Sequence, residues 1–193
     1  MIRGGKVKAY IKLGIAAILI ASTLIAYVPI PWHMIEYTFL SNLIEGVVFA
    51  VSGVLLLTGR RPVPALIDLC LVIMALILLG IVLTNFGSFN FAGPFLFLHV
   101  VNPLLVLFHW LLITEPGQIR HPVDVLAVAA FPAAYIVFLF AHGAISGDYI
   151  YPIFDVTQLG VAHVAIFVGV IVVVFLAVAY ALYFAGRAAA KRV

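Results

Sequence analysis

Polar side chains recur at helical spacing in two stretches of this otherwise apolar chain. In the first stretch they stand at intervals of three, four and seven residues, at Thr38, Ser41, Asn42, Glu45 and Ser52. In the second stretch intervals of three and seven separate His99, Asn102 and His109. Residues spaced in this way share one face of a helix. A hydroxyl and an imidazole are the groups that acyl transfer uses, and we expect the two faces to meet.

A threonine hydroxyl needs a neighbouring base to take its proton when it attacks a carbonyl carbon. His99 can be that base, because the unperturbed imidazole pKa of about 6.5 lies near neutral working pH. Ser41, Asn42 and Asn102 lie within about one helical turn of Thr38 or His99 and can donate hydrogen bonds to the oxyanion of the intermediate. Glu45 can orient one of these residues. The residue types alone therefore allow a Thr–His site.

Each of these residues also has a structural interpretation. Threonine, serine and asparagine often cap helices or form hydrogen bonds between neighbouring membrane helices. A histidine inside a bundle can hold two helices together. Glu45 can be protonated, pair with His109 or belong to a proton path. Catalytic and structural roles stay open at this point.

Membrane-spanning helices are the elements that must position these residues. Of the 193 residues, 66% are hydrophobic and 9% are charged, whereas about 25% of a soluble domain is charged. A helix needs roughly 20 apolar residues to cross about 30 Å of hydrocarbon. Six runs of this kind are predicted, at residues 10–28, 36–58, 63–84, 95–114, 123–142 and 158–184. The sequence therefore predicts an all-α integral membrane protein, with a single six-helix transmembrane domain over residues 1–193.

Basic residues divide the connections between these runs into two classes. Residues that end helices and form turns separate the runs, at 29–31, 59–62, 85–88, 115–117 and 146–148. Lysine and arginine fall on one side only, at Arg3, Lys6, Lys8, Lys12, Arg60, Arg61, Arg120, Arg187, Lys191 and Arg192. Short basic loops stay in the cytoplasm, so we expect both chain termini to be cytoplasmic. The net charge of +3 is thereby explained by topology, and we expect no nucleic acid partner.

Two further histidines are expected at the membrane depth of Thr38 and His99. His142 ends the fifth run on the non-cytoplasmic side, and His163 begins the sixth. We expect them to support the site or bind substrate. The alternative is that they anchor the loop between them at the membrane interface.

Three segments of the chain, taken in order, resemble a known family. They are Glu36-Tyr37-Thr38-Phe39-Leu40-Ser41-Asn42-Leu43, then Leu98-His99-Val100-Val101-Asn102-Pro103-Leu104, then His142-Gly143 followed by Tyr149-Ile150-Tyr151-Pro152-Ile153-Phe154. On a six-span frame they are similar to the androgen-induced and androgen-dependent TFPI-regulating membrane proteins and their bacterial relatives, over about residues 10–184. Animal members of that family are threonine-dependent hydrolases of fatty acid esters of hydroxy fatty acids. The resemblance implies that Thr38 is the nucleophile and His99 the catalytic histidine.

We therefore expect a multi-pass enzyme of a bacterial or archaeal cell membrane that hydrolyses a membrane lipid ester. Thr38 and His99 are the expected catalytic residues. Supporting or substrate-binding roles are expected for Ser41, Asn42, Glu45, Asn102, His142 and His163. No metal or other cofactor is expected, since no compact ligand spacing such as H-E-x-x-H occurs. The pattern specifies no oligomeric state.

Two other classes of function stay open. A haem-binding electron carrier would use histidines of different helices as axial ligands, and His99 and His163 have the same expected depth. A proton-coupled transporter would place Glu45, Asn102 and His109 at a midplane site. The sequence has neither a paired histidine ladder for the first class nor inverted repeats for the second.

Overall fold

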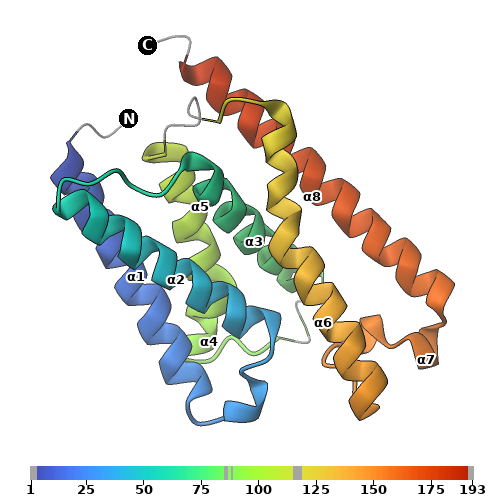
Figure 1. Ribbon diagram of the computed structural model, residues 1–193. Coiled ribbons are helices and arrows are strands. Elements are labelled where there is room, and N and C mark those ends of the chain that lie inside the picture. The colour runs from blue at the N-terminus through green and yellow to red at the C-terminus, as the bar shows by residue number, and fades with distance from the viewer. Residues whose placement is uncertain (1–3, 85–86, 88, 115–118, 191–193) are drawn as a thin grey trace.

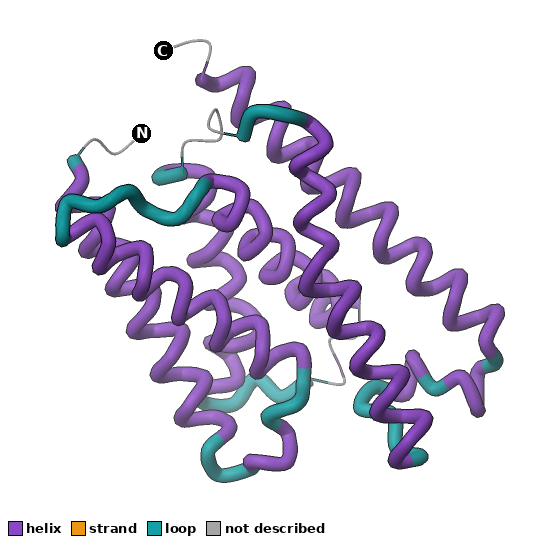
Figure 2. The backbone as a smooth tube through the Cα atoms, in the orientation of Figure 1, coloured by secondary structure: helices purple, strands orange, loops and turns teal. Residues whose placement is uncertain are grey.

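Helices make up the regular structure of the described part of the chain (Figures 1 and 2). The computed structural model describes residues 4–84, 87, 89–114 and 119–190. Six helical segments in it are long and apolar enough to cross a membrane. They are α1 (Gly5–Tyr27), α2 (Tyr37–Leu57), α3 (Ala65–Thr84), Pro94–Leu112, Pro122–Ser146 and α8 (Val161–Ala190). The prediction of an all-α protein with six such helices is confirmed.

Some of these segments are built from shorter pieces. Pro94–Leu112 consists of α4 (Pro94–Leu96), a π-helical turn (Phe97–Val101) and α5 (Asn102–Leu112). Pro122–Ser146 consists of a 3-10 helix (Pro122–Ala129) followed by α6 (Ala130–Ser146). The connections contain 3-10 turns at Pro31–His33 and Pro152–Phe154 and the four-residue helix α7 (Val156–Leu159).

The last span begins later than the sequence predicts. Asp155 caps α7, because its carboxylate accepts hydrogen bonds from the backbone N–H of Thr157 at 2.8 Å and of Gln158 at 3.2 Å. Gly160 then adopts a left-handed φ of 81° and separates α7 from α8. Residue 158 therefore belongs to the connection, and the spanning helix starts at Val161.

The first span begins earlier than predicted, at Gly5, because the basic leader continues the same helix. The predicted turn at 115–117 lies outside the described residues, and of the turn at 85–88 only residue 87 is described. Three of the predicted cytoplasmic basic residues, Arg3, Lys191 and Arg192, also lie outside the described residues.

The start of α1 and the end of α8 lie at one end of the bundle, which we call the terminal end (Figure 1). The connection between α2 and α3 and residues 119–121 lie at the same end, so the described basic loop residues gather there. The opposite, distal end holds the connection between α1 and α2, residues 89–93 and the segment 147–160. Thr38 lies in the first turn of α2 at the distal end, and His99 lies near the start of the helical segment Pro94–Leu112, which begins there.

The helices α1 and α2 approach each other closely through two glycines of α2. A Cβ atom at Gly46 would lie 2.6 Å from Cγ1 of Ile20, and one at Gly53 would lie 2.7 Å from Cγ of Leu13. Small residues allow membrane helices to pack in this way. At the distal end of the same helix pair, the rings of Tyr27 in α1 and Phe39 in α2 meet, with centroids 5.2 Å apart.

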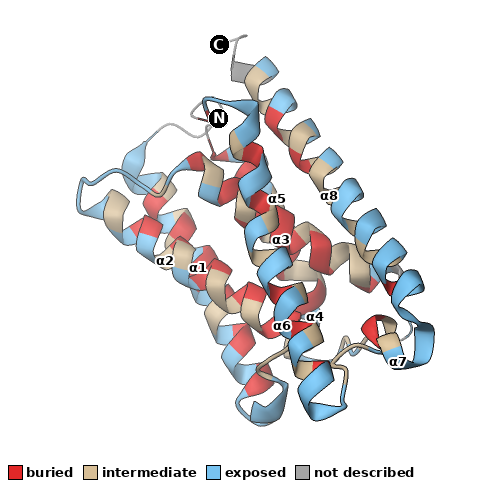
Figure 3. Cartoon of the chain, turned by 45° about the vertical axis from the view of Figure 1, so that its right-hand side comes forward, coloured by how far each residue is buried: buried red, intermediate tan, exposed pale blue. Residues whose placement is uncertain are grey.

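The helix α3 is the most buried of the six spans, and α8 is the least buried (Figure 3). Leu69, Val72 and Ile73 of α3 are fully buried. Apolar side chains of α8 such as Ile166 and Val173 are instead exposed. So long an exposed apolar face would be strongly disfavoured in water and is expected in lipid. These features indicate a multi-pass membrane protein.

The two polar faces predicted from the sequence do meet inside the bundle. All five residues of the first face and all three of the second are buried. The amide of Asn102 donates a hydrogen bond to Oδ1 of Asn42 over 2.7 Å, and the amide of Asn42 donates one to the carbonyl oxygen of Leu98 over 3.4 Å. Lipid offers no hydrogen bonds, and the side-chain N–H groups of Asn42 and Asn102 find their acceptors inside the protein.

Candidate active site

Thr38 is buried in the first turn of α2, at the distal end. It does not cap the helix, since the N-cap residue is Glu36. Its carbonyl oxygen accepts a hydrogen bond from the side-chain amide of Asn42 over 2.8 Å. Its side chain forms hydrogen-bonding contacts with the phenol groups of Tyr27 and Tyr151. The hydroxyl of Thr38 is therefore held among other hydroxyl groups.

His99 lies in the π-helical turn at Phe97–Val101. Pro103 follows four residues later and has no backbone N–H for the carbonyl of His99. The N–H of Asn102 bonds instead to the carbonyl of Phe97, five residues back, which is the π-helical pattern. The wider turn sets the direction of the His99 side chain.

The imidazole of His99 is held in one orientation. Its Nδ1 lies 2.9 Å from the carbonyl oxygen of Asn90. A carbonyl can only accept, so Nδ1 carries the proton and Nε2 is the acceptor. The rings of Phe89, Phe91 and Phe95 surround the imidazole, with centroids 4.9, 5.9 and 6.0 Å away. A neutral, oriented imidazole with an accepting Nε2 is the form that a general base requires.

Thr38 and His99 line one cavity of about 600 Å³. Its polar lining also includes His33, Glu36 and Asn90, and Tyr27 contributes its phenol. We call this space the polar cavity.

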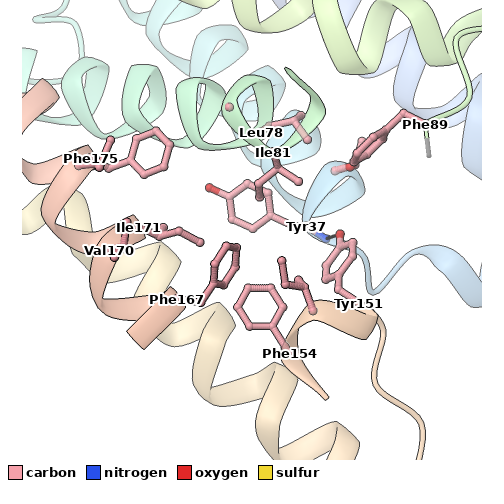
Figure 4. A pocket seen from close by; sticks show the side chains of 14 residues that line it. Tyr37, Leu78, Ile81, Phe89, Tyr151, Phe154, Phe167, Val170, Ile171 and Phe175 are labelled. Carbon is pink, nitrogen blue, oxygen red and sulfur yellow. Dashed lines mark hydrogen bonds between the residues drawn. The ribbon is translucent and has the colours of Figure 1, made fainter. Parts of the chain in front are cut away.

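A second cavity of about 290 Å³ adjoins the polar cavity, and its lining is almost wholly apolar (Figure 4). Phe154, Phe167 and Phe175 line it together with aliphatic side chains of α3 and α8. We call it the apolar cavity. The two cavities share the lining residues Thr38, Ile81, Phe89, Tyr151 and Ile153. Thr38 thus lies where a polar space meets an apolar one.

The phenol of Tyr27 connects Thr38 to the carboxylate of Glu36. The hydroxyl of Tyr27 donates to Oε2 of Glu36 over 2.7 Å, and the other carboxylate oxygen contacts Nδ1 of His33. Because Tyr27 also contacts the side chain of Thr38, the threonine, the phenol and the carboxylate form a continuous network.

Tyr151 completes the surroundings of Thr38 from the segment between α6 and α8. Its phenol oxygen accepts a hydrogen bond from the backbone N–H of Tyr37 over 3.0 Å (Figure 4). Burial, with the nearby carboxylate of Glu36, raises the pKa of Tyr151 to about 12. The phenol therefore keeps its proton at neutral pH and can donate a hydrogen bond beside Thr38.

Comparisons of the chain with protein-family models, with curated proteins and with solved structures find no match. The family resemblance seen in the sequence therefore stays a prediction.

Ser41, Asn42 and Asn102 belong to the scaffold behind Thr38 rather than to the wall of either cavity. The amide of Asn102 donates to Oγ of Ser22 over 3.0 Å as well as to Asn42. Ser41 donates to the carbonyl oxygen of Thr38 over 3.4 Å. The bonds of Asn102 join α1, α2 and α5, and none of the three residues lines either cavity.

The remaining predicted supporting residues line neither the polar nor the apolar cavity. Glu45 is buried deeper in α2, and its Oε1 has no hydrogen-bond partner among the described residues. Nδ1 of His142 donates to the carbonyl oxygen of Asp148 over 3.0 Å. His163 is exposed on α8, unlike the buried His99.

Five polar residues of the polar cavity were not predicted as site residues, namely Tyr27, His33, Glu36, Asn90 and Tyr151, although Glu36 and Tyr151 lie in the segments that carry the family resemblance. Helical spacing gave little information about these residues, because each lies at a helix end or in a connection. In the described residues, no three His, Cys, Asp or Glu side chains are grouped so that they could hold a metal ion.

Proposed function

We propose that this protein is an intramembrane hydrolase of lipid esters, with Thr38 as nucleophile and His99 as general base. The observation that carries the proposal is the position of Thr38, which lines both the polar cavity that contains His99 and the apolar cavity. An amphiphilic ester with its carbonyl group at Thr38 would place a hydrocarbon chain among Phe154, Phe167 and Phe175. Its polar part would lie near His33 and Glu36.

The proposed reaction is an acyl transfer in two stages. Oγ1 of Thr38 attacks the ester carbonyl carbon while its proton passes to Nε2 of His99. The bond to the leaving alcohol then breaks, and the imidazolium returns the proton to that alcohol. A water molecule, deprotonated by the same imidazole, cleaves the acyl-threonine ester and restores the hydroxyl. The products are a fatty acid and an alcohol.

The negative charge on the tetrahedral intermediate needs hydrogen-bond donors placed in advance. Tyr151 fits this role, because its protonated phenol contacts the side chain of Thr38. Tyr27 is less suited, since its proton is donated to Glu36.

We further propose that both chain termini are cytoplasmic and that the membrane is that of a bacterial or archaeal cell. Described lysine and arginine residues of the loops gather at the terminal end, which supports this orientation. Thr38 and His99 would then lie near the outer surface, where water can reach an acyl-threonine.

The proposal is tested by the hydrolysis of a fatty acid ester of a hydroxy fatty acid in detergent micelles. Thr38→Ala and His99→Ala should each lower the rate at least about a hundredfold, because one removes the nucleophile and the other its base. Thr38→Ser keeps a hydroxyl and should retain part of the activity. Thr58→Ala, at an exposed threonine beyond the other end of α2, is the matched control and should keep full activity. Full activity in a folded Thr38→Ala variant would exclude threonine as the nucleophile.

A further inference from the structure

A third cavity, of about 330 Å³, adjoins the apolar cavity on the side away from the distal end. It is lined by α3, by the segment Pro122–Ser146 and by α8, and each described side chain of its lining is apolar. The helix α3 runs toward the distal end, and Ile73 and Ile77 of this lining come before Leu78, the first α3 residue of the apolar cavity. We call this third space the deep cavity.

Phe175 lies where the apolar and deep cavities meet. It lines both of them, as does Ile171 one helical turn earlier in α8. A Cβ atom at Gly80 of α3 would lie 3.2 Å from Cζ of Phe175. The tip of the ring therefore lies against α3, so the ring extends from α8 to α3 at the junction of the two cavities.

Phe175 also lies at the end of the apolar cavity that is remote from Thr38. Phe89 and Tyr151 line the apolar cavity together with Thr38, and both also line the polar cavity. Figure 4 shows these two side chains on one side of the apolar cavity and Phe175 on the other. Val161, the first residue of α8, precedes Phe175 by 14 residues, which corresponds to about 21 Å of helix. An ester with its carbonyl carbon at Thr38 would therefore direct its acyl chain inward from the distal end, toward Phe175.

We propose that Phe175 limits the length of the acyl chain that this site accepts. The inference rests on the proposed hydrolysis of lipid esters at Thr38. A chain that fills the apolar cavity ends against the ring of Phe175. A longer chain collides with the ring, and forcing extra methylene groups into a packed space is unfavourable. With a small side chain at this position, the apolar and deep cavities become continuous and the end of a longer chain enters the deep cavity.

Hydrolysis of p-nitrophenyl esters tests the proposal, because each ester has a single hydrocarbon chain. Octanoyl, lauroyl, palmitoyl and stearoyl esters are compared at one mole fraction in detergent micelles. For the unchanged protein we expect kcat/KM to fall at least about fivefold from the preferred ester to the stearoyl ester. Phe175→Ala should raise the ratio of kcat/KM for the stearoyl ester to that for the lauroyl ester at least about fivefold.

This ratio separates a limit on chain length from a loss of packing, because destabilisation lowers the rates for all esters alike. Phe184→Ala is the matched control, since Phe184 is an exposed residue of α8 and is absent from the described lining of the polar, apolar and deep cavities. It should change the ratio less than about twofold. If Phe175→Ala does not fold, Phe175→Leu should shift the ratio in the same direction by a smaller factor. An unchanged ratio in the folded variant, or no discrimination against the stearoyl ester by the unchanged protein, would overturn the proposal.

Binding of glycerol ethers separates a failure of this inference from a failure of the proposed function, because ethers are not hydrolysed. We expect dodecyl glycerol ether to raise the unfolding temperature of the unchanged protein at a lower mole fraction than octadecyl glycerol ether. Phe175→Ala should remove this preference. If no ester is hydrolysed but the ether preference changes in this way, the limit on chain length stands and the hydrolase proposal fails. Ester hydrolysis with the same chain-length profile in both proteins would give the opposite conclusion.

Discussion

Tyr151 shows how a single residue outside the spans can complete a site inside them. Its phenol accepts a hydrogen bond from the first residue of α2, contacts the side chain of Thr38 and lines both the polar and the apolar cavity. A pKa of about 12 keeps it protonated at neutral pH. In the proposed reaction it would therefore be the best-placed donor to the oxyanion.

Tyr151→Phe should lower kcat by about tenfold to a hundredfold and change KM little, since the lost hydrogen bond acts mainly in the transition state. Steady-state hydrolysis, with thermal unfolding measured in parallel, checks this result. Tyr149→Phe is the matched control, because Tyr149 lies two residues away and lines neither distal cavity. An unchanged kcat in Tyr151→Phe would show that the phenol of Tyr151 does not stabilise the oxyanion.

Helical spacing was sufficient to predict which residues of α2 and α5 point inward. Asn42 and Asn102 were expected on facing surfaces, and they are hydrogen-bonded. Spacing could not predict Tyr27, Glu36 or Tyr151, because no period fixes side-chain direction at helix ends and in connections. Tyr151 reaches Tyr37 across 114 residues of sequence, a contact that depends on the packing of the whole bundle.

Among the elements, helices α1 and α2 do most to fix the surroundings of Thr38. It brings Tyr27 at the end of α1 to Thr38 at the start of α2. Gly46 and Gly53 permit this approach, and they are seven residues apart on one face of α2.

Gly53→Ala should therefore destabilise the protein. The new Cβ would lie 2.7 Å from Cγ of Leu13 and 3.1 Å from the carbonyl oxygen of Ala9, and the backbone atom cannot move aside as a side chain can. We expect the free energy of unfolding to fall by about 1–3 kcal/mol, measured by denaturation in detergent. Gly169→Ala in α8 is the control, because nothing lies within 4 Å of its Cβ position. Equal stability of the two variants would show that close packing at Gly53 is unimportant.

Basic residues at the terminal end are the feature of the whole molecule that predicts its orientation in the membrane. Reporters fused after α8 or inserted near Arg120 should read as cytoplasmic, whereas one inserted near Gly147 should not. The last position lies at the distal end, beside the segment that carries Tyr151. A C-terminal reporter on the outer side would reverse the orientation and place Thr38 near the cytoplasm.

Composition and spacing predicted the number of spans, because exclusion of unpaired backbone groups from lipid leaves few alternatives to a helix. They did not predict the buried ion pair of Lys12 and Asp68. Lys12 was interpreted as part of a basic leader before the first span, whereas in the structure its ammonium group contacts Asp68 of α3 and lies 5.2 Å from the ring centroid of Phe49 in α2. Charged residues near span ends therefore signal topology and can also form interior contacts.

Covalent labelling with an active-site-directed fluorophosphonate, followed by peptide mapping, is the most direct test of Thr38 as nucleophile. The reagent forms a stable phosphonyl ester with an activated hydroxyl and releases fluoride. We predict a label on Thr38 that is lost in Thr38→Ala and is strongly reduced in His99→Ala, because the base no longer activates the hydroxyl. Label confined to other residues, at an unchanged level in folded Thr38→Ala, would contradict the proposed threonine hydrolase.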